Sequence, residues 1–214
     1  SVITQADIHR SGATSIAELL RLVPGMEVAR IDANKWAVTS RGFNNQFSNK
    51  LLVLVDGRTV YTPLFAGVYW DALDMVLEDV DRIEVVRGPG ATLWGANAVN
   101  GVVNIITKSS RETRGLFVSA GVGSEDRAIG AARYGCTLGA DASYRVDAKY
   151  FLRDRLVFAD GTAGADDWRV ARSSLRMDWE PSGDDEIAMS GTAYRGEVSE
   201  SSALATPKAP FSEI

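Results

Sequence analysis

The sequence predicts a two-part chain, with a small α+β domain over residues 1–110 and an antiparallel sheet of long strands over residues 111–214. Two observations predict this division. Up to Lys108, short apolar runs alternate with helix patterns and glycine-containing turns, which is typical of a mixed domain. After Lys108, a two-residue apolar–polar period takes over and continues through segments longer than ordinary strands.

The N-terminal residues predict two short helices. Thr4 or Asp7 can cap the first helix, because their side-chain oxygens can accept hydrogen bonds from free backbone amides. Apolar residues at helical spacing in residues 16–23 predict the second helix, and Pro24-Gly25 is expected to end it.

Short strands are expected through the rest of this domain. Residues 26–30 and 36–40 predict two strands joined by a polar turn. The apolar run at residues 51–56 is too short for a helix and is bounded by turn residues, so it predicts a buried strand. A helical turn at residues 77–81 should lead into a further strand at residues 83–86.

The most informative stretch is RIEVVRGPGATLWGANAVNGVVNIITK, residues 82–108. A strand followed by Gly88 and Gly90 invites comparison with a dinucleotide-binding loop, which needs Gly or Ala at its sixth position. That position is Leu93, and no Gly-Lys-Ser/Thr sequence follows, so the spacing argues against a nucleotide site. The glycines are therefore expected to serve turns and close backbone approaches.

Composition excludes several classes of function. The formal net charge is −5, from 23 basic and 28 acidic residues, so no basic nucleic-acid surface is implied. A single cysteine, Cys136, excludes an internal disulfide, and a single histidine, His9, argues against a histidine metal site. No cofactor or metal is expected. The sequence has no apolar run of about 18 residues and no signal-peptide pattern, which is expected of a cytoplasmic protein or of a piece of an exported one.

Four segments of the first half occur in a specific order, and these are SGATSIAELLRLVPGMEV (residues 11–28), SRGFNNQFSNKLLVLVDGRTVY (40–61), PLFAGVYWD (63–71) and LEDVDRIEVVRGPGATLWGANAVNGVVNIITK (77–108). In this order they resemble the plug domain of TonB-dependent outer-membrane receptors over residues 3–108. The resemblance implies a plug held inside a β-barrel, in the outer membrane of a Gram-negative bacterium. It also implies capture of a scarce ligand outside the cell, with energy supplied by the TonB complex.

The second half fits the barrel of such a receptor. Residues 142–153 alternate between an apolar and a polar set, and Phe151 is the one exception in the polar set. Similar runs occur at residues 116–122, 128–134, 171–179 and 187–194. Strands of about ten residues with one apolar face are typical of outer-membrane barrels. A soluble antiparallel sheet with one wet face shows the same alternation, but strand length and the resemblance favour the barrel.

About five strands fit before the chain ends, whereas the barrel of this family has about 22. The sequence therefore predicts antiparallel transmembrane strands of a partial barrel. The resemblance implies that the plug ends toward the periplasm, so residues 124–126 and 154–167 should connect strands outside the cell. Residues 137–141 and 181–185 should then form the inside turns. The longest connection falls outside, as these barrels require.

Two loops form the candidate ligand-binding surface. Residues 44–49 carry amides and a phenyl ring, and residues 61–70 are rich in aromatic side chains. Loops on a rigid scaffold commonly bind ligands, and clustered aromatics suit a ligand wall. Alternatively, these aromatics pack against a barrel wall or each other. In the family the matching loops face outside and touch the substrate, so the resemblance proposes Arg41, Phe43, Asn45, Phe47, Tyr61, Phe65, Tyr69 and Trp70.

Three charges are candidates for docking the plug to its barrel. Arg82, Glu84 and Arg87 alternate with apolar residues along a predicted strand. On a soluble protein they would form a solvated face, but inside a barrel they need partners because an unpaired buried charge is costly. The family pairs such charges with the barrel wall, so Arg82 and Arg87 are expected to meet barrel carboxylates.

The expected function is that of the N-terminal part of a TonB-dependent receptor for active uptake of an iron-siderophore or similar metal chelate. The alternatives are a ligand-sensing receptor of the same fold and a cobalamin or saccharide transporter. An enzyme is rejected, because carboxylates such as Asp56, Asp71 and Asp74 lack an accompanying histidine, nucleophile elbow or metal spacing. The expected partners are the TonB complex, whose contact peptide would lie upstream of Ser1, an extracellular small molecule and outer-membrane lipid, with no nucleic acid.

Overall fold

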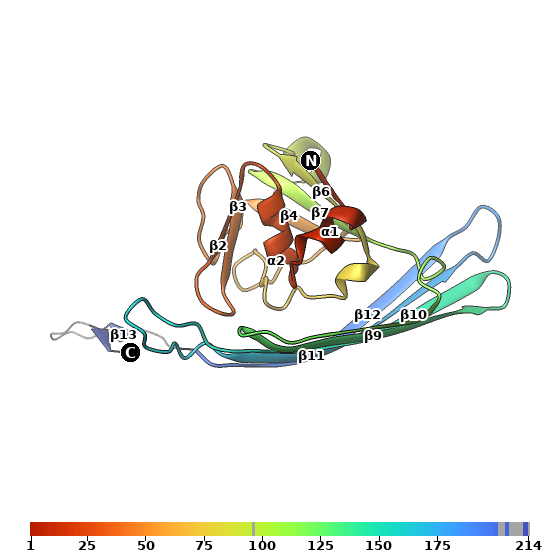
Figure 1. Ribbon diagram of the computed structural model, residues 1–214. Helices are drawn as coiled ribbons and strands as arrows, with labels where there is room; N and C mark the ends of the chain where they lie inside the picture. Colours follow the sequence, from red (N-terminus) through yellow and green to blue (C-terminus); the bar gives the residue numbers. More distant parts are fainter. Residues whose placement is uncertain (96, 201–203, 206–211, 214) are drawn as a thin grey trace.

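The computed structural model describes residues 1–95, 97–200, 204–205 and 212–213. An N-terminal domain lies on one face of a sheet of long strands (Figure 1). The elements of the N-terminal domain are β1 (Val2–Thr4), α1 (Gln5–Ser11), α2 (Ile16–Leu19), β2 (Met26–Arg30), β3 (Trp36–Ser40), β4 (Leu51–Val55), β5 (Arg58–Thr59), β6 (Val80–Arg87), α3 (Ala91–Trp94) and β7 (Gly101–Thr107), with 3-10 helices at Leu20–Leu22 and Leu77–Asp79.

Both predicted helices form, and the caps explain their ends. Thr4 and Asp7 form a reciprocal capping box at the start of α1, and Gly12 ends the helix with a φ of 68°. Hydrogen bonds from Thr4 lower the pKa of the Asp7 carboxyl to about 2. The second helix is α-helical only to Leu19 and continues as a 3-10 turn to Leu22, so it is tighter at its end than predicted.

The main sheet of the N-terminal domain has the strand order β1-β6-β7-β4-β5, with β4 parallel to β7 and the other pairs antiparallel. Strand β4 is buried on both faces, which explains its unbroken apolar run. Leu51 and Val53 pack into the main core, whereas Leu52 and Leu54 pack against Ala98 in a second cluster.

Two glycines of the 82–108 stretch have the structural roles expected of them. Gly88 has a φ of 107° at the turn after β6, a conformation that other residues rarely adopt. A Cβ atom on Gly101 would lie 2.5 Å from the Val86 carbonyl oxygen, so this glycine lets β7 approach β6. Strands β2 and β3 pair as a separate hairpin whose bounds are those predicted.

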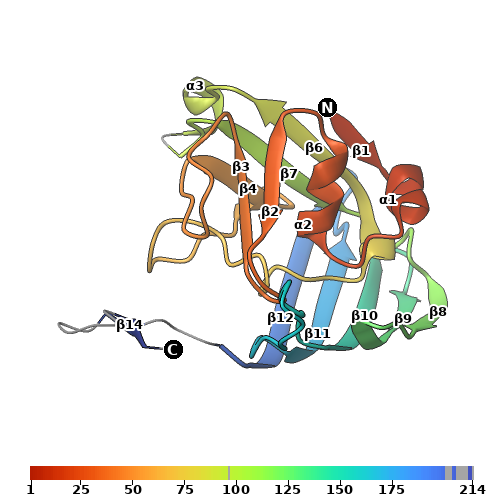
Figure 2. The ribbon, with the colours of Figure 1, turned by 60° about the vertical axis from the view of Figure 1, so that its left-hand side comes forward.

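The second sheet, called here the long-strand sheet, has the order β12-β11-β10-β9-β8 and is antiparallel throughout (Figures 1 and 2). Its strands are β8 (Gly115–Gly121), β9 (Asp126–Leu138), β10 (Ala142–Arg153), β11 (Trp168–Trp179) and β12 (Ile187–Val198), and a short pair, β13 (Leu204–Ala205) with β14 (Ser212–Glu213), follows. The five predicted strands are therefore confirmed. Strands β9 to β12 have 12 or 13 residues each, longer than strands of ordinary globular domains.

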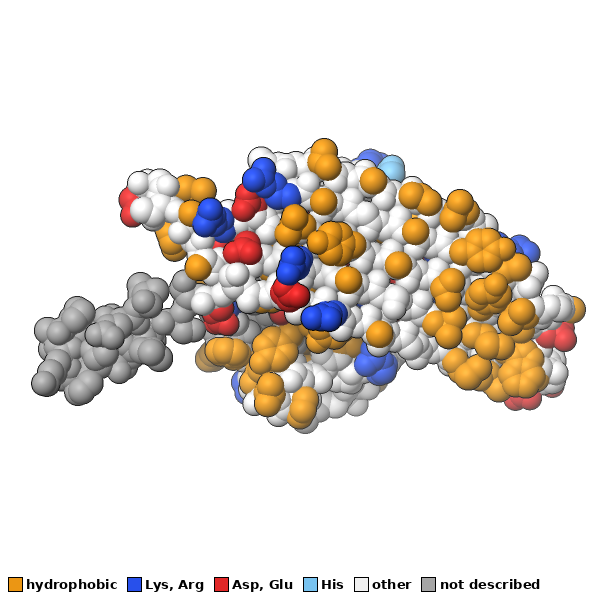
Figure 3. All heavy atoms as spheres, turned by 90° about the horizontal axis from the view of Figure 1, so that it is seen from below, with side chains coloured by type: hydrophobic (Ala, Val, Ile, Leu, Met, Phe, Trp, Pro, Cys, Tyr) orange, Lys and Arg blue, Asp and Glu red, His pale blue; other side chains and the backbone are white. Residues whose placement is uncertain are grey.

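The N-terminal domain covers the polar face of the long-strand sheet, and the apolar face is exposed. Along β10, Arg145 and Lys149 are each 6% exposed, whereas Val146 and Tyr150 are 41% and 45% exposed. Figure 3 views the sheet from its uncovered side and shows hydrophobic side chains spread across it. A soluble sheet would bury the opposite face, because exposing apolar area to water is unfavourable. The arrangement is that of a barrel wall with a polar interior.

Within the residues that the structure describes, no helix has both the length and the apolar character needed to cross a membrane.

Candidate functional site

The two predicted ligand loops meet through a row of aromatic rings. The Phe47 ring lies edge-on to the Phe65 ring at 5.2 Å, and the Phe65 ring lies edge-on to the Tyr69 ring at 5.0 Å. Phe43 and Phe47 are 76% and 54% exposed, so much of this aromatic surface is open to solvent. We call the three contacting rings of Phe47, Phe65 and Tyr69 the aromatic ridge. Such rings offer a large contact area with little conformational entropy to lose.

The backbone beneath the ridge is held in an uncommon conformation. Arg41 and Phe43 have φ values of 62° and 60°, a region that side chains other than glycine seldom occupy. The Gly42 amide donates to the Glu27 carboxylate at 2.8 Å, and the Asn45 side-chain oxygen accepts from the Phe47 amide at 2.8 Å. Conformations of this kind are concentrated at binding and active sites, where the surroundings hold them in place.

The structure places two of the eight predicted ligand residues in packed positions. Trp70 is 7% exposed and belongs to the main core. The Tyr61 hydroxyl donates to the Leu51 carbonyl at 2.8 Å, and burial raises the pKa of this phenol to about 12. Arg41 is exposed and its guanidinium lies beside Gly88. Ligand contact by any of the eight residues remains a prediction.

The three predicted docking residues have their partners inside the N-terminal domain. Arg82 donates to Glu84 at 2.8 Å and to Asp81 at 2.6 Å, so the pKa of Glu84 is lowered by Arg82. Arg87 donates to the Pro24 carbonyl. In the part of the chain that the structure describes, none of these three side chains forms an ion pair with the long-strand sheet. Their docking to a barrel wall remains a prediction.

A different set of charges joins the N-terminal domain to the long-strand sheet. Here the domain provides carboxylates and the sheet provides cations, the reverse of the pairing expected for Arg82 and Arg87. The pairs are Asp74 with Lys149 at 2.6 Å, Asp56 with Arg176 at 3.1 Å, Asp79 with Arg145 at 3.6 Å, and Asp79 with Arg133. In the sequence, the cations of the sheet belong to the polar set of the alternating strands, and this pattern is the signal that could have identified them.

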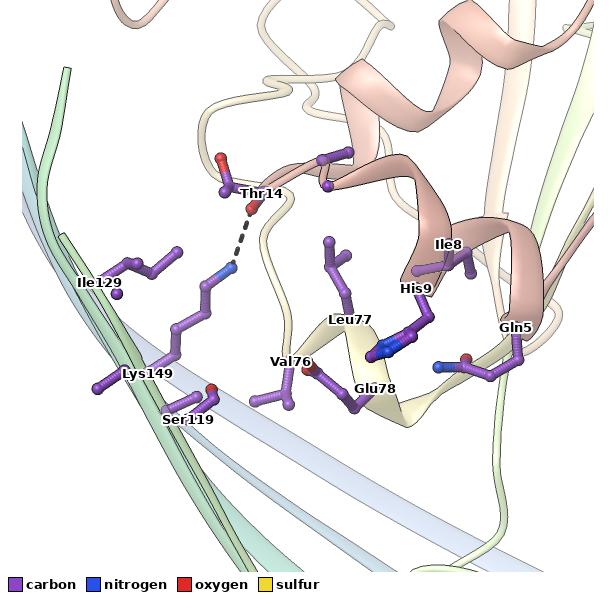
Figure 4. A pocket seen from close by; sticks show the side chains of 15 residues that line it. Gln5, Ile8, His9, Thr14, Val76, Leu77, Glu78, Ser119, Ile129 and Lys149 are labelled. Atoms are coloured by element: carbon purple, nitrogen blue, oxygen red, sulfur yellow. Dashed lines mark hydrogen bonds between the residues drawn. The ribbon is translucent and has the colours of Figure 1, made fainter. Parts of the chain in front are cut away.

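Lys149 is the most completely satisfied of these cations (Figure 4). Its ammonium donates to Asp74 at 2.6 Å, to the Met75 carbonyl at 3.0 Å and to the Thr14 carbonyl at 3.3 Å. These three acceptors match the three protons of the ammonium group. A cavity of about 250 Å³ lies beside it, lined in part by His9, Leu77 and Ile129.

Near the predicted outside end of the strands, the turn between β2 and β3 contacts the 154–167 connection (Figure 2). The Ala33 amide donates to the Asp166 carboxylate at 2.8 Å. Ala33 also packs with Phe151 and Trp168, whose rings lie 4.5 Å apart. Phe151, the exception in the alternating pattern of β10, is 2% exposed in this contact.

At the opposite end, Ser110 ties the end of the N-terminal domain to the sheet. Its amide and its hydroxyl each donate to the Asp178 carboxylate at 2.6 Å, and Arg176 pairs with the same carboxylate. Ser110 is fully buried, so this anchor is shielded from water. Among the described residues, no group of three or more His, Cys, Asp or Glu side chains is placed to hold a metal ion.

Comparisons with known proteins agree with this geometry. The family profile described as "TonB-dependent Receptor Plug Domain" matches residues 1–102. The vitamin B12 transporter BtuB of Vibrio vulnificus is 36% identical over 127 residues, which cover 58% of this chain and 20% of the relative. BtuB of Vibrio cholerae is 37% identical over 125 residues, with the same coverage. The chain therefore spans about a fifth of the length of these relatives.

Solved structures extend the similarity into the long-strand sheet. The copper transporter OprC has a TM-score of 0.72 at 20% identity, over 87% of this chain and 29% of that protein. The siderophore receptor PirA of Acinetobacter baumannii has a TM-score of 0.71 at 22% identity, over 92% of this chain and 31% of that protein. At these identities the likeness concerns the fold. PirA of Pseudomonas aeruginosa, at 26% identity and a TM-score of 0.64, covers 92% of this chain and 34% of that protein.

The relatives and solved structures named above are transporters and receptors. Residues 1–102 therefore match the plug domain of TonB-dependent receptors, a family that resides in the outer membrane of Gram-negative bacteria, and the antiparallel strands that follow share the fold of similar solved receptors.

Proposed function

We propose that this chain is the N-terminal part of a TonB-dependent transporter that takes up a scarce ligand from outside the cell. The observation that carries the proposal is the position of the N-terminal domain on the polar face of a sheet whose apolar face is exposed. A domain in this position would block a polar barrel interior until it moved. Its aromatic ridge would then offer the first contact for a ligand.

The ligand we propose is a metal chelate, with an iron-siderophore as the first candidate. The ridge supports this class because exposed rings and amides suit a large organic chelate, and because similar solved structures include siderophore receptors and a copper transporter. Cobalamin is the second candidate, since the BtuB relatives match more than half of this chain.

The contacts between the N-terminal domain and the long-strand sheet, called here the docking surface, support the proposed movement of the domain. Several of these contacts are ion pairs and hydrogen bonds next to cavities, so water can replace them when the domain is pulled. We propose that the pull comes from the TonB complex through a peptide upstream of Ser1. We also propose that residues 1–110 move as the plug, that residues 111–214 remain part of the wall, and that the exposed apolar face contacts outer-membrane lipid.

Uptake by the full-length receptor in cells tests this proposal. Cells expressing it should accumulate a radiolabelled ferric siderophore, with radiolabelled cyanocobalamin as the second probe, and accumulation should require a functional TonB. Uptake of neither probe, or uptake that is unchanged without TonB, would contradict the proposal.

The aromatic ridge gives this experiment a residue-level arm. Phe47→Ala removes a terminal ring of the ridge and should weaken binding of the transported probe by up to about tenfold, since an aromatic contact contributes about 0.5–1.5 kcal/mol. Leu93→Ala is the matched control, because Leu93 is also an exposed apolar side chain (87%) but is not part of the ridge. Equal affinity of the Phe47→Ala variant and the control would argue against ligand contact at the ridge.

A further inference from the structure

Two adjoining cavities separate the N-terminal domain from β11 and β12. The first, called here the outer cavity, has a volume of about 540 Å³ and is lined by Arg58, Tyr61, Tyr69, Arg172 and Tyr194 together with threonine and small apolar residues. The second, the inner cavity, has about 90 Å³ and lies nearer the inside turns. The two cavities share Arg58, Leu73, Arg172 and Thr192, so they form one continuous space along the interface.

The outer cavity is basic. Two arginines line it, one from the N-terminal domain and one from the long-strand sheet, and no aspartate or glutamate is among its lining residues. The inner cavity differs, because Asp56, Asp79 and Asp147 line it beside its arginines. An anion in the shared space would therefore be stabilised in the outer cavity and repelled by the carboxylates further in.

Arg172 is the exception among the cations on the covered face of the sheet. The other five each form an ion pair with a carboxylate, and they are Arg133, Arg145, Lys149, Arg153 and Arg176. Arg172 forms none among the described residues. Its Nη2 atom reaches only the Thr192 hydroxyl, at 3.4 Å, and its Nε is buried without a hydrogen-bond partner.

The carboxylates of Asp74 and Asp147 form neither an ion pair nor a hydrogen bond with Arg172. Asp74 accepts from Lys149 at 2.6 Å, and Asp147 accepts a hydrogen bond from the Ser174 hydroxyl. Arg172 is partly buried, and its buried Nε is a desolvated donor without a partner, which is costly unless a ligand supplies an acceptor with negative charge. Arg58, across the same cavity, also lacks a carboxylate within ion-pair distance in the described part of the chain.

The outer cavity is connected to the aromatic ridge by a shared residue. Tyr69 contacts Phe65 in the ridge and also lines the cavity. A ligand that leaves the ridge along Tyr69 would next meet the two arginines. Guanidinium groups bind carboxylate, phosphate and catecholate oxygens through paired hydrogen bonds, which a neutral ligand cannot match.

We propose that the outer cavity is a binding site for the anionic oxygens of the transported ligand, held between Arg58 of the N-terminal domain and Arg172 of the wall. The inference rests on the proposed function and names the ligand class as an anionic chelate. An anion bridging the two arginines would also connect the movable domain to the fixed wall, so release from this site would be coupled to movement of the domain.

Selenate, a tetrahedral oxyanion that scatters anomalously, tests the site without any assumption about transport. Crystals of the full-length receptor soaked in selenate should show an anomalous peak within hydrogen-bond reach of Arg172, and Arg172→Gln should remove it. Arg195→Gln is the matched control, because this β12 arginine is 87% exposed and does not line the cavity. Absence of the peak, or its persistence in Arg172→Gln, would overturn the proposal.

Uptake measurements distinguish a site for the transported ligand from a site that binds an adventitious ion only. Ferric citrate and a ferric tris-catecholate serve as anionic probes, and a neutral ferric hydroxamate serves as the reference. Arg172→Gln should lower the apparent affinity for an anionic probe about tenfold relative to the neutral one, with Arg172→Lys retaining part of it. A selenate peak with an unchanged uptake preference would mean an adventitious ion only and would overturn the proposal. Failure of the unmodified receptor to take up any chelate would count against the proposed function, while the selenate result would still decide the anion site.

Discussion

At the scale of single residues, the contact between the two parts of the chain depends on buried charges that have partners. Lys149 and Asp74 have side chains only 5% and 9% exposed, and they lie 75 positions apart in the sequence. The ion pair tolerates burial because neither charge is left alone and because the Lys149 ammonium also donates to the Met75 and Thr14 carbonyls. The cost of burying this pair is the reason that removing one partner should have a large effect.

Lys149→Met should therefore weaken the contact around Asp74 by about 3–5 kcal/mol, because the Asp74 carboxylate would remain buried without its cation. Amide hydrogen exchange of the full-length receptor measures this as faster exchange near Asp74. The double variant Asp74→Asn with Lys149→Met should recover part of the protection, since no buried charge then remains. Lys50→Met, at an exposed position, is the control. Unchanged exchange in Lys149→Met would contradict a docking role for this pair.

At the scale of elements, the glycine-rich stretch depends on close contact between β6 and β7. Gly101→Ala should destabilise the N-terminal domain by about 1–3 kcal/mol, because the new methyl group would lie 2.5 Å from the Val86 carbonyl oxygen. Gly183→Ala is the matched control, since a Cβ there meets nothing within 4 Å. Thermal unfolding of the two variants should separate them clearly, and equal stability would show that β7 can shift to make room.

The same elements show what local sequence could and could not predict. The β2–β3 hairpin and the buried strand β4 followed from short-range patterns, because strand period and turn residues act over a few positions. The ion pairs of the docking surface did not, since Asp74 and Asp79 find their partners only when two distant segments pack. Strand alternation and the resemblance predicted that Arg82 docks to a barrel carboxylate; in the structure Asp81 and Glu84 pair with it, and its docking to a barrel wall remains a prediction. Alternation in β10 predicted two faces, and only the packing identified which face is covered.

At the scale of the whole molecule, the long-strand sheet has its polarity reversed relative to a soluble protein. Its covered face carries paired charges, whereas its uncovered face presents side chains such as Leu116, Val118 and Leu175, which are 74%, 65% and 48% exposed. In water this arrangement would leave a large apolar surface exposed. In a bilayer the same surface would contact lipid, so the environment of this face decides the effect of a charged substitution there.

Val146→Arg tests that environment. Val146 is 41% exposed, in the central part of β10 on the uncovered face, so in a soluble sheet an arginine would be tolerated with little effect. In a bilayer Val146→Arg should lower the free energy of unfolding by about 2–4 kcal/mol, because the charge would lie among lipid tails. Leu138→Arg, at the end of β9 on the same face and 52% exposed, should cost only about 0–1 kcal/mol if that strand end lies at the depth of the polar headgroups. Folding of the full-length receptor into lipid vesicles at graded urea measures both values. Equal values for the two variants would mean that this face does not contact the hydrocarbon core, whereas a larger cost at Val146 would locate the middle of β10 within it.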